Sequence, residues 1–229
     1  MNPPRTPPTP IFPSLEQLHL DGPEALPWLH LLASYQNGTL RNGSPSTTSN
    51  TSTRESLEYI GCPSNTIVDP TLLSSIITFR NLVALRVKSY CSDPEGCTFR
   101  LTDNDMENLA TALPRLEMLE LGRPCGFNSC SNTVASLLSI SVHCLNLTVL
   151  ETHFNTRTIV GDMQRLLDID AGRDKAKCKL KFLKSESLPF EVDGEDIETV
   201  VKGFRAIFPC LRTAGNGSWY EVKYRLRDI

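Results

Sequence analysis

The sequence lacks the features that mark several large classes of protein. None of its apolar runs approaches the roughly 18 to 20 residues that a membrane-spanning helix needs, and its start, MNPPRTPPTPIFP, holds no apolar signal-peptide core. Lys and Arg total 23 against 26 Asp and Glu, a net charge of −3, so there is no basic excess of the kind that binds nucleic acid through its phosphates. We therefore expect no membrane or nucleic acid among its partners, and a cytoplasmic or nuclear location.

The common catalytic and cofactor motifs are also missing. The chain contains no Gly-x-Gly-x-x-Gly, Walker-type phosphate loop, His-Glu-x-x-His or Gly-x-Ser-x-Gly, patterns that bind phosphates, hold zinc or present a serine nucleophile. Cys144 and His143 do not suit a nucleophile and its base, because adjacent helical residues point about 100° apart. The acids Asp103, Asp105 and Glu107 suit the first turns of a helix, where the helix dipole favours them. We predict a protein that is not an enzyme, with no catalytic residues and no cofactor.

The eight cysteines do not form a recognisable framework. There is no Cys-x-x-Cys, and the closest pairs are Cys91 with Cys97 and Cys125 with Cys130. Structural zinc sites prefer two short, doubled spacings, so we predict reduced thiols and no metal. One alternative stays open, in which these four cysteines follow neighbouring strands, meet in space and form a metal-binding module.

What the sequence does contain is a repeat. A segment similar to Leu-x-x-Leu-x-Leu recurs at residues 15–20, 82–87, 116–121, 147–152 and 180–185. From the leucine at 82, the steps are 34 (to 116), 31 (to 147), 33 (to 180) and 31 (to 211). A degenerate copy, Leu57-Glu-Tyr-Ile60, has an irregular spacing. Within one segment the period of two places Leu119 and Leu121 on the same side of a strand.

Helical periodicity separates these segments. Apolar residues recur at i, i+3, i+4 and i+7, which is typical of a helix with one buried face, over residues 69–80, 102–113, 131–144, 158–168 and 195–209. Thr102 is the predicted N-cap of one helix and Pro114 its stop signal. Tight turns should join helix to strand at Leu113-Pro-Arg-Leu116 and at Phe208-Pro-Cys-Leu211, which share an apolar residue, Pro, any residue and Leu with Phe12-Pro-Ser-Leu15.

A unit of one strand and one helix cannot bury its own leucines, so copies must stack on each other. Stacking predicts an α/β fold with a parallel sheet and helices on its outer side. We expect a disordered Pro-rich tail at residues 1–10 and one repeat domain over residues 11–229. Residues 37–55, rich in Ser, Thr, Asn and Gly, are predicted to be a flexible polar insertion.

The segments resemble leucine-rich repeat proteins. The phrases LTDNDMENLATALPRLEMLELGRPC, TVASLLSISVHCLNLTVLETHFNT and GFRAIFPCL are similar to the repeat region of fungal (basidiomycete) F-box-like proteins, over residues 11–212. The resemblance implies a leucine-rich repeat solenoid with parallel strands on its concave side and helices on its convex side. It also implies substrate recognition for a cullin-type ubiquitin ligase. Because we find no F-box, we expect a carboxyl-terminal piece or a truncated gene product, with a Skp-type adaptor as partner only if an F-box is supplied elsewhere.

Residues that alternate with the core leucines should face away from the helices and line up across the concave side. Charged groups around apolar anchors suit recognition of a protein. The predicted partner-binding residues are His19, Arg86, Lys88, Met118, Glu120, Val149, Glu151, His153, Phe182 and Lys184. Two alternatives stay open: a solvated sheet face whose charges pair across strands, and a truncated solenoid without independent function.

Overall fold

The computed structural model describes residues 17–21, 55–61, 68–88, 99–121, 131–169, 178–185, 194–214 and 219–227, with only the backbone for the first two ranges and for Lys88, Ile169, Tyr220, Glu221 and Arg227. These ranges hold the strands β1 (Gln17–Asp21), β2 (Glu55–Gly61), β3 (Leu82–Lys88), β4 (Met118–Leu121), β5 (Val149–Glu151), β6 (Phe182–Lys184) and β7 (Thr213–Ala214). The helices are α2 (Pro70–Ile76), α3 (Asp103–Ala112), α4 (Val134–His143), α5 (Ile159–Ile169), α6 (Gly194–Ile207) and α7 (Tyr220–Arg227). The predicted tail and most of the predicted insertion lie outside the described residues, although Glu55 already belongs to β2.

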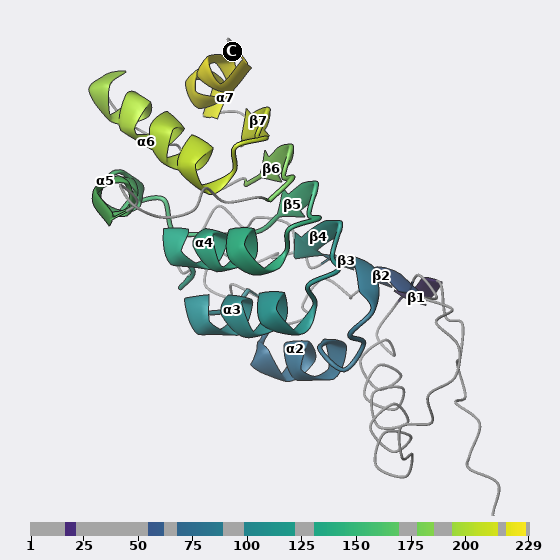
Figure 1. The fold of residues 1–229 in the computed structure, drawn as a ribbon. Coiled ribbons are helices and arrows are strands. Elements are labelled where there is room, and N and C mark those ends of the chain that lie inside the picture. Colours follow the sequence, from purple (N-terminus) through teal and green to yellow (C-terminus); the bar gives the residue numbers. More distant parts are fainter. Residues whose placement is uncertain are drawn as a thin grey trace, which may run out of the picture.

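The strands form one parallel sheet in which spatial order follows chain order, β1 to β7. From β3 onward, the described residues place one helix between each strand and the next along the chain. Figure 1 shows the strands in one row and the helices α2 to α6 on one side of that row. The predicted α/β class with a parallel sheet is therefore confirmed.

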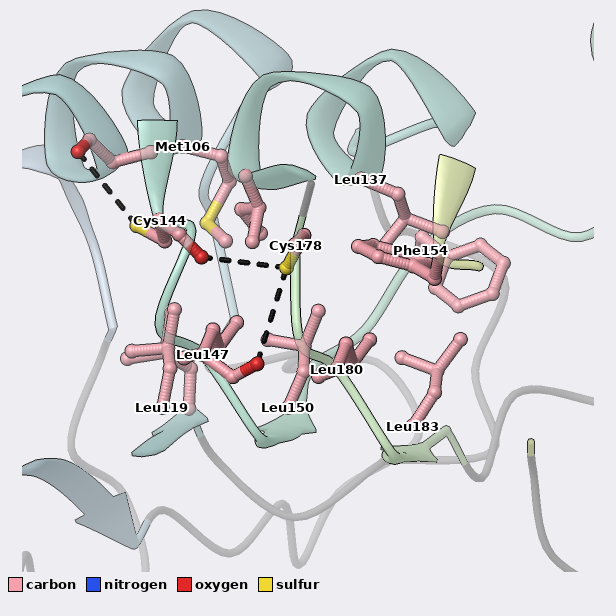
Figure 2. Close-up of a cluster of buried hydrophobic side chains, with 14 of the residues drawn as sticks. Met106, Leu119, Leu137, Cys144, Leu147, Leu150, Phe154, Cys178, Leu180 and Leu183 are labelled. Atoms are coloured by element: carbon pink, nitrogen blue, oxygen red, sulfur yellow. Dashed lines mark hydrogen bonds between the residues drawn. The ribbon is translucent and has the colours of Figure 1, made fainter. Parts of the chain in front are cut away.

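The leucines predicted to be buried lie in register. Leu85, Leu119, Leu150 and Leu183 are partners across β3 to β6, and each is at most 1% exposed. Figure 2 shows Leu119, Leu150 and Leu183 of this row beneath the helices, with Leu147 and Leu180 above them. Each strand thus extends the core begun by the strand before it, which is why the unit has to repeat.

The tight turn between helix and strand also recurs. The amide of Leu116 donates to the Leu113 carbonyl at 3.3 Å, and the amide of Leu211 donates to the Phe208 carbonyl at 3.0 Å. The same i to i+3 bond joins Leu82 to Phe79 at 3.0 Å and Leu147 to Cys144 at 3.1 Å. Pro at the second position of the first two turns supplies the φ that such turns need. Both turns predicted from the sequence are confirmed.

The predicted start of α3 is confirmed as a capping box. The Thr102 hydroxyl accepts from the Asp105 amide at 3.3 Å, and the Asp105 carboxylate accepts from the Thr102 amide at 2.9 Å. Asp103 reaches the neighbouring unit instead, because its carboxylate accepts from the amide and the hydroxyl of Thr133, both at 2.7 Å. Since Thr133 is the N-cap of α4, the starts of two successive helices are tied together.

The carboxyl-terminal end of the sheet is covered by α7, a helix that the sequence patterns did not predict. It packs against α6 and β7, and Figure 1 shows it beyond β7 at that end. Trp219, 1% exposed, lies just before α7, with its ring 6.0 Å from Phe154 and 5.8 Å from Phe204. Val222 and Leu226 on α7 are buried as well, so the last unit has a neighbour on both sides.

Candidate functional site

The side of the sheet away from the helices carries two aligned rows of side chains. Burial alternates along β4, where Leu119 and Leu121 are buried and Met118 and Glu120 are half-buried, as expected for a strand with one covered side. We call this surface the strand face. Its apolar row is Ala84, Met118, Val149 and Phe182, and its charged row is Arg86, Glu120, Glu151 and Lys184.

The charged row is arranged symmetrically, with basic residues outside and acidic residues inside. Arg86 Nε lies 3.2 Å from Glu120 Oε2, and Lys184 Nζ lies 3.3 Å from Glu151 Oε2. Glu120 and Glu151 are direct partners on neighbouring strands, so two carboxylates stand side by side in the middle of the row. Such partly exposed pairs contribute less than about 1 kcal/mol each to stability. The alternative of a solvated sheet face that binds no partner also predicts charge pairs between strands.

The apolar row runs beside these charges. Phe182 is 45% exposed, a large fraction for an aromatic side chain, while Met118 and Val149 are half-buried. Arg86 Nε also lies 3.1 Å from Met118 Sδ, which links the two rows. The result is an aromatic anchor and two aliphatic contacts bordered by opposite charges.

His153 does not belong to this surface, contrary to the prediction from the sequence. It is 4% exposed, and its ring lies 5.0 Å from that of Phe99. Its carbonyl oxygen accepts from Asn132 Nδ2 at 3.2 Å. The physical reason is that β5 ends at Glu151, so the alternation of strand side chains does not continue to residue 153.

For two further predicted residues the structure describes only the backbone. His19 lies in β1 and Lys88 in β3, but their side chains are outside what the structure describes. The seven predicted residues with described side chains that the structure aligns on the strand face are Arg86, Met118, Glu120, Val149, Glu151, Phe182 and Lys184.

The buried thiols are structural. Cys144, 0% exposed, ends α4, and its Sγ lies 3.7 Å from the carbonyl oxygens of Ala110 and Leu113. Burial raises the pKa of the Cys144 thiol to about 12, so the nucleophilic thiolate is not formed near neutral pH. Burial likewise raises the pKa of Cys178 to about 11. Cys144 is thus a buried residue at a helix end.

Metal binding gains no support within the described residues, where no group of three or more His, Cys, Asp or Glu side chains is arranged to hold a metal ion. The proposed ligands Cys91, Cys97, Cys125 and Cys130 all lie outside those residues. The metal-binding alternative therefore stays a hypothesis.

Sequence reasoning missed a pocket of about 930 Å³ at the β6 and β7 end of the sheet. Its walls come from the starts of β6 and β7, the end of α6, the turn that follows it, and α7. The lining residues are Lys181, Phe182, Arg205, Pro209, Cys210, Leu211, Arg212, Thr213 and Leu226. The 31-residue step from Leu180 to Leu211 was enough to predict that Lys181 and Arg212 lie side by side. No local pattern predicts that Arg205 and Leu226 lie beside these two residues.

No family model matches the sequence, and no curated protein or solved structure is significantly similar to it. No helix in the described part of the chain is both long enough and apolar enough to cross a membrane.

Proposed function

We propose that the chain is a leucine-rich repeat solenoid that binds another protein on its concave strand face. The observation that carries this proposal is the register of the apolar and charged rows across β3 to β6. Exposed aromatic and aliphatic groups bordered by charges are the usual composition of a recognition surface. Two features support the repeat architecture. The strands follow the same order in the sheet as in the sequence, and the same turn recurs between helix and strand.

The resemblance to F-box-like proteins suggests which class of partner this face serves. In such proteins the repeats hold a substrate while an F-box binds the Skp-type adaptor of a ubiquitin ligase. On this proposal the present chain supplies substrate recognition, and recruitment of the ligase requires an F-box from elsewhere.

Affinity purification with quantitative mass spectrometry tests the proposal. The bait is compared with a variant that carries Arg86→Glu, Glu120→Lys and Glu151→Lys on the strand face. A matched control carries Glu107→Lys, Arg157→Glu and Asp168→Lys, which change the net charge equally at exposed positions outside that face. Circular dichroism establishes that all three baits are folded.

The proposal predicts that specific proteins bind the unmodified chain and the control but are lost from the strand-face variant. Recovery of the same proteins by all three baits would reject the strand face as the binding surface. Recovery of no specific protein by the unmodified chain would favour a solenoid without independent function.

A further inference from the structure

The pocket beside β6 and β7, which we call the basic pocket, concentrates positive charge. Lys181, Arg205 and Arg212 line it, and no Asp or Glu is among its lining residues. Lys181 and Arg212 are held close by the sheet, because the Arg212 amide donates to the Lys181 carbonyl at 3.0 Å. Within the described part of the chain, neither of these two cations forms an ion pair with a carboxylate.

Arg205 is fixed in place from the helix side. Its Nη2 donates to the carbonyl oxygen of Arg225 on α7 at 2.8 Å, which uses one of the five N–H donors of a guanidinium group. The remaining donors are available to an anion. Among the described residues no carboxylate pairs with any of the three cations, so they repel each other, and the repulsion is relieved when an anion enters.

Apolar groups form much of the rest of the pocket lining. Leu211 and Leu226 are each 6% exposed, and Phe182 and Pro209 complete this part of the lining. A volume of about 930 Å³ accommodates several side chains, within the usual size of a ligand site. A small inorganic anion would neutralise the cations but leave the apolar wall uncovered.

Phe182 connects this pocket to the strand face. It lines the pocket and also ends the apolar row, as the register partner of Val149. A chain bound across the strands therefore reaches the basic pocket without leaving the surface. From this continuity we infer that the basic pocket receives an acidic peptide segment of the partner protein, with Asp or Glu on the three cations and a neighbouring apolar side chain against Phe182 and Leu211. This inference rests on the proposed protein-binding function.

Selection from a phage-displayed library of random dodecapeptides against the full chain tests it. Selected peptides are then labelled with fluorescein, and their affinities are measured by fluorescence anisotropy. The pocket variant is Lys181→Glu with Arg212→Glu. The matched control, Arg100→Glu with Arg157→Glu, makes the same charge change at exposed positions that do not line the pocket.

We expect the selected peptides to pair Asp or Glu with an apolar residue. Their affinity should fall about tenfold or more in the pocket variant, with little change in the control. Replacing their Asp and Glu by Asn and Gln should cause a similar loss.

Three results would overturn the inference. The first is a set of selected peptides without acidic enrichment, the second is binding to the pocket variant as tight as to the unmodified chain, and the third is a selection that yields no peptide. If the peptides still bind the pocket variant but no longer bind the strand-face variant, the inference about the basic pocket is rejected while binding on the strand face is retained. If the affinity purification recovers no partner while acidic peptides still require Lys181 and Arg212, the proposed function fails and the pocket remains an acidic-peptide site.

Discussion

The thiol of Cys178 donates to the carbonyl oxygen of Cys144 at 3.3 Å, across the boundary between two successive units. The Cys144 thiol faces the unit before it in the same way, with the Leu113 carbonyl oxygen 3.7 Å away. Figure 2 shows both sulfur atoms between the helices and the leucine row. Each of these two buried thiols thus contacts a carbonyl oxygen at the end of the helix in the unit before it. The last carbonyls of any helix have no partner within the helix and need one from elsewhere.

These thiols should be chemically protected in the folded protein. At pH 8, iodoacetamide should label Cys210, which is exposed, and leave Cys144 and Cys178 unmodified, because they are buried and protonated. Peptide mass spectrometry of native and urea-unfolded samples measures the difference. Rapid labelling of Cys144 under native conditions would contradict its burial.

The same raised pKa predicts how stability changes at high pH. The unfolded chain releases the Cys144 proton near the ordinary pKa of 9.0, whereas the folded chain retains it until about pH 12. The folded state therefore binds more protons over this window, and the free energy of unfolding falls as the pH rises from 9 toward 12. Urea denaturation at pH 8 and pH 10 should show a stability advantage over Cys144→Ala that shrinks by about 1 kcal/mol. A constant advantage would contradict the assigned pKa.

Gly203 should resist replacement by alanine although it lies inside α6. A Cβ atom there would lie 2.9 Å from Met163 Cβ and closer still to its sulfur, so α5 and α6 would have to separate. We expect Gly203→Ala to destabilise the protein by about 1 to 3 kcal/mol, measured by chemical denaturation.

Gly161→Ala on α5 is the matched control, because its added Cβ would meet nothing within 4 Å. It should raise stability by roughly 0.5 to 1 kcal/mol, as glycine is costly inside a helix. Equal effects of the two substitutions would mean that α5 and α6 are not closely packed at Gly203.

Asp103 should contribute stability through its bonds to Thr133. The Asp103→Asn variant keeps the shape but loses two charge-assisted hydrogen bonds of 2.7 Å, so we expect a cost of about 1 to 3 kcal/mol. Glu107→Gln, an exposed change on the same helix, should stay within about 0.5 kcal/mol. A loss no larger than that of Glu107→Gln would show that the starts of α3 and α4 are not coupled.

The repeat made much of the fold predictable. Leu119 and Leu121 are both 0% exposed, because the period that places them on one side of a strand also determines what stacking must bury. The parallel register then follows from the even spacing, which is why Met118, Val149 and Phe182 could be aligned from sequence.

The errors arose where the periodicity stops. The prediction for His153 extends the strand alternation two residues beyond the end of β5. The helix α7 and the basic pocket have no repeat of their own, and Arg205 and Leu226 meet only after α6 and α7 have packed. Such contacts depend on tertiary packing, which no local spacing encodes.

Hydroxyl-radical footprinting of the chain with a captured partner tests the central claim most directly. Binding on the strand face should reduce oxidation of Met118 and Phe182, and leave Val142 and Leu145, which are exposed at the end of α4 and just after it, as reactive as in the free chain. Protection of Val142 and Leu145 with unchanged oxidation of Met118 and Phe182 would place the partner on the helices and contradict the account.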